Sequence, residues 1–401
     1  MIQRTIEKHI SSLMNEYFSV SIFGPRQCGK TTLAKTLFPS FSYANLEDMN
    51  VRSLAKNDPE EFFTRFPEPV IIDEIQRVPE LLSTVQVRID KNQKKGQYLI
   101  TGSQQISLKS SITQSLAGRT AIVQMLPLSI SELYSANIKL DRDSQLVSGF
   151  MPFLYAESGH SPFEYYKNYM NTYLERDIVQ IAAVHDLIRF EKFMRLLAGR
   201  VGQLVNNSIL ATEVGVSSTT ISSWLSVLEA SHVIYTLKPW FKNRNSQVVK
   251  TPKIYFCDTG LVSYLLGIET PEQMIRDPLL GNIFENFVVI EALKTRLNLG
   301  LEPNLYFFRN SNGLEIDLIL QEQNKLKLFE IKSGKSLNDE FCRNMKNFSA
   351  KYNEDIVSDS TKGTVIYSGE TYESYKDFGF YNFSNIPQLF ESKTSTFRLN
   401  F

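Results

Sequence analysis

A glycine-rich segment near the start of the chain has the residue types and spacing of a phosphate-binding loop. It reads Gly24-Pro-Arg-Gln-Cys-Gly29-Lys30-Thr31-Thr32, follows the apolar stretch Val20–Phe23 and precedes the helical pattern Leu33–Leu37. Glycines at this spacing let backbone N–H groups close around phosphate oxygens, and the positive end of the following helix adds to the attraction. We expect Lys30 to reach the outer phosphates and the Thr31 hydroxyl to bind Mg²⁺. The predicted nucleotide-contacting residues are Gly24, Pro25, Arg26, Gln27, Cys28, Gly29, Lys30, Thr31 and Thr32.

Two further apolar stretches end in polar residues that suit hydrolysis of the bound nucleotide. Pro69–Asp73 reads as a strand followed by Glu74. We expect Asp73 to hold Mg²⁺ opposite Thr31, and Glu74 to polarise the attacking water. The stretch Gln97–Thr101 is followed by Ser103 and Gln104, either of which could position the water or sense the outermost phosphate. These strand ends predict an ATP-hydrolysing site built on a parallel sheet.

These segments together resemble a known class of enzyme. Gly24–Thr32, Ile71–Glu74 and Leu99–Gln104 look like the Walker A, Walker B and sensor 1 elements of AAA-type ATPases. The later segments Leu116–Arg119 and Leu126–Leu133 are similar to those of one prokaryotic AAA family, which carries an uncharacterised carboxy-terminal domain. Its interdomain motif is similar to Tyr173–Asp177, so that the resemblance runs from about residue 18 to about residue 335.

The resemblance also implies an arginine that neutralises charge on the phosphate oxygens, from the same or a neighbouring subunit. Arg119 and Arg176 are the two candidates, and a surface or helix-cap role is the alternative for each. An arginine supplied by a neighbour would require a homo-oligomer.

The middle of the chain has the pattern of a helix-turn-helix. A short helix around Ile209–Val214, a turn at Gly215 and a second helix from Ser217 or Ser218 to Leu228 fit this arrangement, with Thr219, Thr220, Ser222 and Ser223 exposed. The residues that follow, 233–249, suit a wing-like hairpin. From Val233 to Cys257 there are five basic residues and no acidic ones, so DNA contact through residues 217–253 is one interpretation. A protein-binding module is the other, because the second helix lacks Arg and Lys.

The last part of the chain predicts a second possible site. Its expected order is a helix at 282–297, strands at 305–309, 314–320 and 325–332, a helix near 339–348 and a strand at 364–367. This order resembles the core of restriction-endonuclease-like PD-(D/E)xK folds, which implies that Asp317 and Glu330 share a divalent metal near Glu285. Lys332 would then orient or deprotonate a water for attack on a phosphodiester. The alternatives are a fold used only for binding and a set of surface salt bridges, and the proline that usually starts the motif is absent.

Composition agrees with several domains in one chain. The 401 residues correspond to roughly 2.7 domains at about 150 residues each. Lys plus Arg and Asp plus Glu each number 43 and 42% of the residues are apolar, which excludes a disordered chain and a globally basic DNA-coating protein. Without a signal-like start or an apolar run of about 18 residues, we expect a cytoplasmic protein that does not enter the membrane. The cysteines Cys28, Cys257 and Cys342 are expected to be reduced, and because the histidines are scattered, we expect any metal to sit on oxygen ligands.

These observations predict an α/β protein. We expect an AAA-type P-loop ATPase domain at 1–150, a helical linker at 151–200, a winged helix-turn-helix at 201–256, a PD-(D/E)xK nuclease-like domain at 257–370 and a tail at 371–401. The leading hypothesis is a Mg²⁺-dependent ATPase coupled to the later domains and acting on or near DNA. Two alternatives stay open: an ATP-gated DNA nuclease in host defence, and a slow ATP-dependent switch that controls a protein partner or a DNA site.

Overall fold

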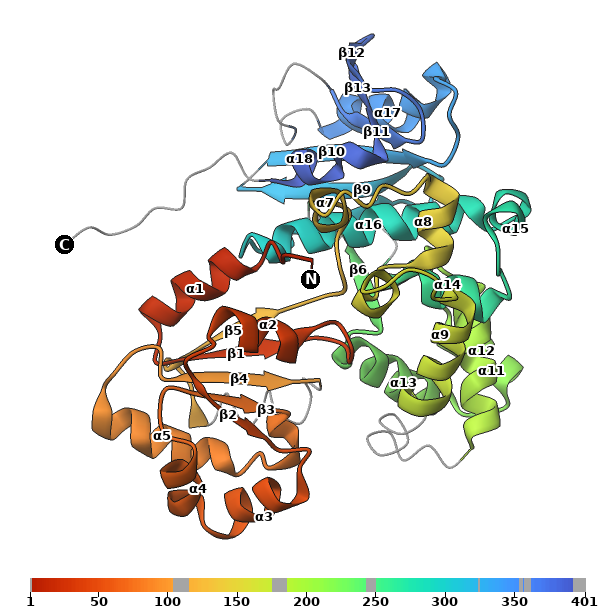
Figure 1. Ribbon diagram of the computed structural model, residues 1–401. Coiled ribbons are helices and arrows are strands. Elements are labelled where there is room, and N and C mark those ends of the chain that lie inside the picture. Colours follow the sequence, from red (N-terminus) through yellow and green to blue (C-terminus); the bar gives the residue numbers. More distant parts are fainter. Residues whose placement is uncertain are drawn as a thin grey trace, which may run out of the picture.

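The computed structural model describes residues 2–103, 115–174, 186–242, 250–323, 325–352, 356 and 362–391. In Figure 1 a small sheet with its helices lies at the lower left, a second and larger sheet lies at the top, and a group of helices lies at the right. The protein is α/β, with a parallel sheet first and a mixed sheet after it. None of the described helices is long and apolar enough to cross a membrane.

The first sheet has five strands in the order β2-β3-β4-β1-β5, and all of its pairs are parallel. The side chains of its strands alternate between two layers: Val20, Ile22 and Ile71 pack beneath α1 and α2, while Val70 and Ile72 pack beneath α3, α4 and α5. The carboxyl ends of these strands therefore meet at one edge, where ligands bind in open α/β sheets. The elements are α1 (Glu7–Glu16), β1 (Ser19–Phe23), α2 (Lys30–Leu37), β2 (Ser42–Asn45), α3 (Met49–Asn57), α4 (Pro59–Arg65), β3 (Val70–Asp73), η1 (Ile75–Arg77), α5 (Leu81–Asn92), β4 (Tyr98–Gly102) and β5 (Thr120–Gln124).

A helical region follows the first sheet and contains the predicted helix-turn-helix. Asn206 caps the first of its helices through two backbone N–H groups, Gly215 ends that helix at a φ of 84°, and Ser217 caps the next helix. Polar residues at helix starts and a left-handed glycine at a helix end are the usual signals for helix boundaries. The turn could therefore be predicted from the sequence. The elements are α7 (Ile130–Ser135), α8 (Arg142–Ser148), η2 (Pro152–Tyr155), α9 (Pro162–Tyr169), η3 (Met170–Leu174), α11 (Leu187–Ala198), α12 (Asn207–Val214) and α13 (Ser218–Ala230).

The second sheet has eight strands in the order β12-β13-β11-β10-β9-β8-β6-β7. Strand β6 begins the hairpin predicted at 233–249, but its antiparallel partner β7 lies after residue 249. Strand β6 also pairs with β8, where Lys238 lies opposite Tyr306. The β6–β7 pair therefore forms one edge of this sheet, and β6 is also the next element after α13 in the chain. The elements are β6 (Ile234–Pro239), β7 (Lys253–Phe256), α14 (Thr259–Leu266), α15 (Pro271–Arg276), α16 (Leu280–Asn298), β8 (Leu305–Arg309), β9 (Glu315–Glu322), β10 (Lys325–Lys332), η4 (Asp339–Cys342), α17 (Arg343–Tyr352), β11 (Thr364–Tyr367), β12 (Tyr372–Tyr375), β13 (Phe378–Asn382), η6 (Phe383–Asn385) and α18 (Ile386–Phe390).

The prediction of a tail at 371–401 is wrong for most of its length. Strand β13 pairs with β11, and the ring of Phe390 stacks on Phe329 with centroids 4.5 Å apart. Polar residues between these short elements hid their pattern, although Phe378, Phe380 and Phe390 supply enough apolar surface to hold them on the sheet. Residues 392–401 lie outside the described part.

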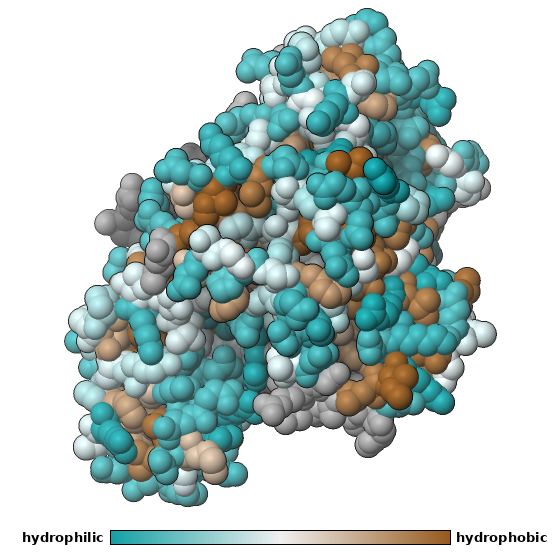
Figure 2. All heavy atoms as spheres, turned by 45° about the vertical axis from the view of Figure 1, so that its right-hand side comes forward, coloured by the Kyte–Doolittle hydropathy of each residue, from teal (hydrophilic) through white to brown (hydrophobic). Residues whose placement is uncertain are grey.

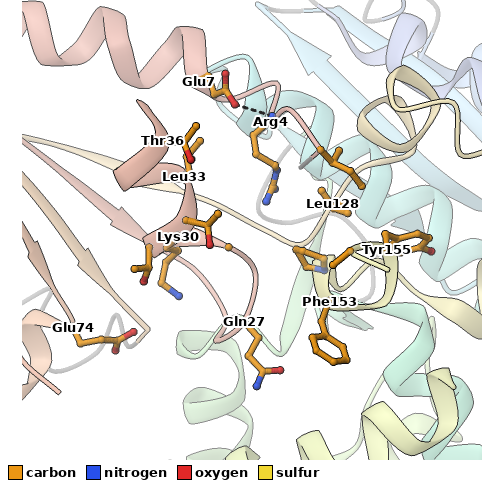
Figure 3. Close-up of a pocket in the computed structure, with 16 residues that line it drawn as sticks. Arg4, Glu7, Gln27, Lys30, Leu33, Thr36, Glu74, Leu128, Phe153 and Tyr155 are labelled. Carbon is orange, nitrogen blue, oxygen red and sulfur yellow. Dashed lines mark hydrogen bonds between the residues drawn. The ribbon is translucent and has the colours of Figure 1, made fainter. Parts of the chain in front are cut away.

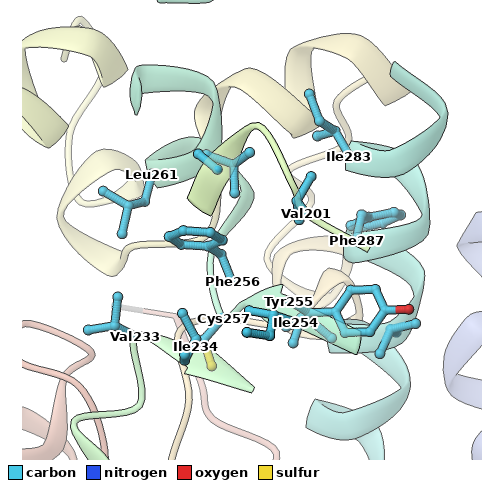
Figure 4. Packing of buried hydrophobic residues seen from close by; sticks show 14 of the residues in the cluster. Val201, Val233, Ile234, Ile254, Tyr255, Phe256, Cys257, Leu261, Ile283 and Phe287 are labelled. Atoms are coloured by element: carbon cyan, nitrogen blue, oxygen red, sulfur yellow. The ribbon is translucent and has the colours of Figure 1, made fainter. Parts of the chain in front are cut away.

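One hydrophobic core joins the helical region to the second sheet. It contains residues from Leu126 on the segment after β5 to Phe390 in α18, and its centre is the packing of β7 and α14 against α16. Figure 4 shows Phe256 and Tyr255 from β7 close to Phe287 of α16 and Leu261 of α14. On the face drawn in Figure 2, hydrophilic residues predominate and hydrophobic ones form small separate patches. These two regions therefore share their core, whereas the first sheet has its own.

Candidate active site

The predicted phosphate-binding loop connects β1 to α2 at the carboxyl edge of the first sheet. Gly29 has a φ of 97° and directly precedes α2, and a Cβ on Gly24 would lie 1.9 Å from the backbone oxygen of Met125. Both positions therefore require glycine. Lys30 is 5% exposed, and its Nζ donates to the backbone oxygens of Gly24 at 2.9 Å and Pro25 at 2.8 Å. The ammonium group thus lies at the loop itself.

Asp73, at the end of β3, accepts hydrogen bonds from hydroxyl groups on three other elements. Thr31 Oγ1 is 2.9 Å from Asp73 Oδ2, and the Tyr43 hydroxyl is 2.7 Å from the same oxygen. The Thr101 hydroxyl donates to Oδ1. Burial and the Asp73 carboxylate raise the pKa of Tyr43 well above its usual value, so this hydroxyl stays a donor. The site joins α2, β2, β3 and β4 around one carboxylate.

Glu74 begins a short turn beside Asp73 in the left-handed conformation, with a φ of 59°. Its backbone N–H donates to Thr101 Oγ1 at 3.3 Å, and its carboxylate accepts a hydrogen bond from Gln76 Nε2. Ser103 Oγ lies 2.9 Å from Gln76 Nε2 and 3.4 Å from Glu74 Oε2. The structure therefore brings Glu74 and Ser103 together. Gln104 lies outside the described residues.

A cavity of about 610 Å³ opens beside the loop. Lys30, Thr31, Gln27 and Glu74 line its polar side, as Figure 3 shows for several of these residues. The wall from the segment after β5 and from η2 is largely apolar, through Leu128, Pro152, Phe153, Tyr155 and Ala156. The amino-terminal segment and α2 add both apolar and polar residues, among them Ile2, Arg4, Glu7, Thr32 and Thr36. A polar end beside a phosphate-type loop and an apolar end match the two halves of a nucleotide, and the volume lies in the ordinary range for ligand pockets.

Arg4 is a buried residue of this site that sequence analysis missed. Its Nη1 donates to the backbone oxygen of Cys28 at 2.8 Å and its Nη2 to that of Leu126 at 2.7 Å. Its Nε forms a 3.1 Å ion pair with Glu132, which is 1% exposed. Arg4 therefore ties the phosphate-type loop to the segment after β5. Nothing in the local sequence around Arg4 indicates these partners, because they lie 24 to 128 residues away.

The same segment is held from its other side by α16. The backbone N–H of Ile130 donates to Glu291 Oε2 at 2.8 Å, and Lys294 Nζ donates to the backbone oxygen of Leu128 at 2.7 Å. Glu291 and Lys294 are both 1% exposed and form an ion pair of 2.8 Å. Residues 126–132 are thus bonded on one side, through Arg4, to the loop and on the other side to α16.

Arg119, one of the two arginine candidates, lies too far from the loop to complete the site of its own chain. Arg119 precedes β5, whose first residue, Thr120, lies opposite Ser19 at the amino end of β1. Its Nε forms a 2.6 Å ion pair with Asp90 on the surface. About four residues of strand, or ~13 Å, separate this end of β1 from the loop. Arg176 and the end of the predicted interdomain motif lie outside the described residues.

The predicted basic surface is only partly present. Lys238, Lys242 and Lys250 are exposed, but Lys253 is 3% exposed and forms ion pairs with Glu285 at 2.9 Å and Glu315 at 2.7 Å. Trp240, in the same stretch, is buried against Phe308 and Phe348. Arg244 lies outside the described part of the chain. Thr219, Ser222 and Ser223 on α13 are exposed as predicted, and Thr220 is half-buried.

In the predicted second site, Lys332 forms ion pairs with Asp317 and Glu330, and Lys253 forms one with Glu285. Asp317 of β9 and Glu330 of β10 lie side by side in an antiparallel pair, and Asp317 Oδ2 accepts the Ile331 N–H at 2.9 Å. Lys332 Nζ is 2.8 Å from Glu330 Oε1 and 3.6 Å from Asp317 Oδ2. Glu330 Oε2 is buried and has no hydrogen-bond partner among the described residues.

Glu285, predicted to lie near Asp317 and Glu330, interacts electrostatically with both, but its carboxylate is bonded to other residues. Its Oε1 accepts hydrogen bonds from Lys253 Nζ and, at 2.6 Å, from the Tyr255 hydroxyl. Within the described ranges no group of three or more His, Cys, Asp or Glu residues is placed to hold a metal. Burial, followed by the charge of Asp317, raises the pKa of Glu330 to about 8. The Glu330 carboxyl is therefore largely protonated near neutral pH.

The strand order, the loop at the carboxyl end of β1 and the acidic end of β3 define an AAA-type P-loop ATPase. Residues 17–134 match a family model described as an AAA domain. Residues 140–272 and 280–389 match two models described as domains of unknown function, DUF8612 and DUF4143.

The chain belongs to the same family as an uncharacterised protein of Mycobacterium tuberculosis. The two are 33% identical over 315 residues, which is 78% of this chain and 70% of the mycobacterial protein. An uncharacterised protein of Haemophilus influenzae is 26% identical over 241 residues, covering 56% of this chain and 57% of that protein. Among solved structures, the Walker-type ATPase PABY2304 of Pyrococcus abyssi is 14% identical, with a TM-score of 0.41 over 66% of this chain and 96% of that one.

Proposed function

We propose that the chain binds Mg-ATP in the cavity beside residues 24–32 and hydrolyses it. The observation that carries this proposal is the hydrogen bond between Thr31 and Asp73. The Thr31 hydroxyl, on α2, lies 2.9 Å from the buried carboxylate of Asp73, on β3. Hydroxyl and carboxylate oxygens are the ligands that Mg²⁺ prefers beside nucleotide phosphates. A Cβ has no room at Gly24, and Gly29 has a positive φ of 97°, so both loop positions keep a bare backbone that fits close approach of phosphate.

Each polar residue then has a defined task in hydrolysis. Lys30 exchanges its bonds to the Gly24 and Pro25 oxygens for phosphate oxygens, which carry more negative charge. Thr31 and Asp73 would hold Mg²⁺, which neutralises phosphate charge when bound. Glu74 accepts hydrogen bonds from the attacking water and orients it, while Ser103 and Gln76 fix the Glu74 carboxylate. Phe153 and Leu128 lie on the apolar side of the cavity, where the base would lie.

Lys30→Ala tests this assignment most directly. We expect ATP turnover to be abolished and ATP binding to weaken strongly, because Lys30 is the cation that faces the phosphates. Lys91→Ala, on the exposed end of α5, is the matched control and should behave like the wild type. Unchanged turnover in Lys30→Ala would contradict the proposal.

A second candidate function is cleavage of phosphodiesters at Asp317, Glu330 and Lys332. It is favoured by the buried Glu330 oxygen that lacks a partner, because a divalent cation between Glu330 and Asp317 would supply one. The restriction-endonuclease-like order of elements supports the same interpretation. Cleavage of plasmid and single-stranded DNA with Mn²⁺ or Mg²⁺ should disappear in Lys332→Ala and persist in Lys327→Ala, its neighbour on β10. No cleavage by the wild type of any nucleic acid would contradict this second function.

DNA is the proposed partner of the helix-turn-helix region, along α13 and the exposed lysines Lys238, Lys242 and Lys250. We treat β6 and β7 as the wing of this unit. Phosphate contacts must give a steep dependence of affinity on salt, so titrations of duplex DNA at two salt concentrations separate a DNA site from a protein-binding module.

ATP turnover measured with and without DNA distinguishes a coupled ATPase from a slow switch. Turnover against protein concentration reports whether a neighbouring subunit completes the site.

A further inference from the structure

His232 brings a buried imidazole from the helix-turn-helix region to the first sheet. It lies on the turn between α13 and β6, in the left-handed conformation with a φ of 56°, and is 3% exposed. Its Nδ1 is 2.8 Å from Nε2 of Gln124, the last residue of β5. This contact crosses 108 positions of sequence. His232, from the helix-turn-helix region, is therefore hydrogen bonded to β5, the strand next to β1.

The contact with Gln124 places His232 close to the phosphate-binding loop. Gln124 lies opposite Phe23 in the register of β5 and β1, and Gly24, the first residue of the loop, follows Phe23. Lys30 Nζ is bonded to the Gly24 oxygen at 2.9 Å. Burial, and then the positive charge of Lys30, lower the pKa of His232 to about 3, so the ring is neutral and an electrostatic neighbour of that lysine.

The hydrogen bond with Gln124 also fixes where the imidazole carries its proton. The amide nitrogen of Gln124 can only donate, so Nδ1 of His232 accepts and the neutral ring holds its proton on Nε2. This Nε2 is buried and has no hydrogen-bond partner within the part of the chain that the structure describes. Buried donors ordinarily have a partner. An N–H donor without one, on a residue that is hydrogen bonded to the strand end next to the phosphate-type loop, is suited to an anion.

We propose that His232 is a phosphate-binding residue whose Nε2–H donates to a phosphate oxygen of the nucleotide held by residues 24–32. The inference rests on the proposed nucleotide site and adds a ligand to it from a different region of the chain. Because His232 directly joins α13 to β6, nucleotide phosphate then fixes the helix-turn-helix region against the ATPase sheet. Loss of the nucleotide leaves the donor unpaired and weakens that contact.

Equilibrium titrations of ATP, ADP and adenosine separate a phosphate contact from a packing role. His232→Leu removes the donor, His232→Gln keeps an amide donor in its place, and His9→Gln on α1 is the histidine control. In His232→Leu we expect ATP and ADP to bind about tenfold more weakly or worse, as for loss of a hydrogen bond to a charged group. Adenosine affinity should equal that of the wild type, and His232→Gln should lose less than His232→Leu. Circular dichroism and thermal unfolding show whether each variant is folded.

Two results would overturn the proposal: wild-type affinity for ATP and ADP in both His232 variants, or an equal loss for adenosine. If the wild type binds nucleotide and Lys30→Ala does not, only the assignment of His232 has failed; if the wild type binds none, the proposed function has failed with it. An imidazole ¹⁵N spectrum of the wild type, with its four histidines, needs no variant at all. The Nε2 signal of His232 should shift with ADP and not with adenosine, and the same response to both would contradict the proposal.

Discussion

The Thr31 hydroxyl and the Asp73 carboxylate are hydrogen bonded to each other, with Thr31 Oγ1 3.1 Å from Oδ1 and 2.9 Å from Oδ2. The hydroxyl of a helix start and the acid of a strand end thus lie within hydrogen-bonding distance of each other. Tyr43 and Thr101 hold the same carboxylate in place. A small, hard cation would need only to insert between ligands that are already oriented.

Asp73→Asn should therefore separate metal binding from nucleotide binding. The amide keeps the size of the side chain but loses its charge, so we expect the Mg²⁺ concentration that half-saturates ATP turnover to rise at least tenfold. Binding of ADP without Mg²⁺ should change little. Asp90→Asn, which alters a surface ion pair, is the control. An unchanged Mg²⁺ dependence in Asp73→Asn would contradict the role given to Asp73.

Glu74→Gln should block turnover while preserving ATP binding. The amide can still accept hydrogen bonds from Gln76 or Ser103, but it is a much weaker base toward the attacking water. We expect turnover to fall by about 10²- to 10⁴-fold. Glu80→Gln, six residues further on and exposed, should match the wild type. Single-turnover measurements with pre-bound ATP check the prediction, and a loss confined to ATP affinity would argue against it.

Arg4→Ala should destabilise the protein as well as weaken nucleotide binding. It leaves Glu132 buried without its cation and removes the bonds to the Cys28 and Leu126 oxygens. Losing one partner of a buried ion pair costs about 3–5 kcal/mol. Urea unfolding measures the change, and Arg52→Ala, on the outer surface of α3, provides the reference. A change below about 1 kcal/mol would mean that Arg4 does not hold the loop.

Stability should depend on pH through Glu330. Its pKa is about 8 in the folded protein against 4.5 for the ordinary side chain. Between these values the folded state binds more protons than the unfolded state, so the free energy of unfolding falls as pH rises. This contribution is complete below pH 4.5 and is lost as the pH passes 8. The difference in unfolding free energy between wild type and Glu330→Gln should therefore shift with pH in that window, and a constant difference would contradict the assignment.

Binding of Mn²⁺ at the same cluster should release protons. A cation between Asp317 and Glu330 requires both carboxylates to be charged, and Glu330 is largely protonated at pH 7. Calorimetry in two buffers of different ionisation enthalpy measures the release directly. We expect tighter binding at pH 8.5 than at pH 6.5, with Asp317→Asn showing no binding. Equal affinity at the two pH values would show that Glu330 is not a ligand.

The parts of the ATPase site that sequence could predict are those encoded locally. Residues 24–32 hold their glycines, lysine and threonine within one turn, and the strand before Asp73 is a continuous apolar run, so both stand out without a structure. His232 and Gln124 do not, because only the packing of α13 on the first sheet brings them together. The count of charges also placed Lys253 on a basic surface. It could not reveal that Lys253 is paired with Glu285 and Glu315, because these residues are far from it in the sequence. Arg4 was missed for the same reason as His232.

Strand β6 belongs at once to the helix-turn-helix region, through α13, and to the second sheet, through β8. The pairing of Lys238 with Tyr306 closes a loop of almost seventy residues, which is a slow step for a folding chain. Until β8 arrives, the backbone groups of β6 on that side have no partner, and they are open to pairing with another chain. The order of synthesis therefore matters: a newly made chain cannot complete the pairing of β6 before β8, the third strand of this sheet in chain order, has left the ribosome.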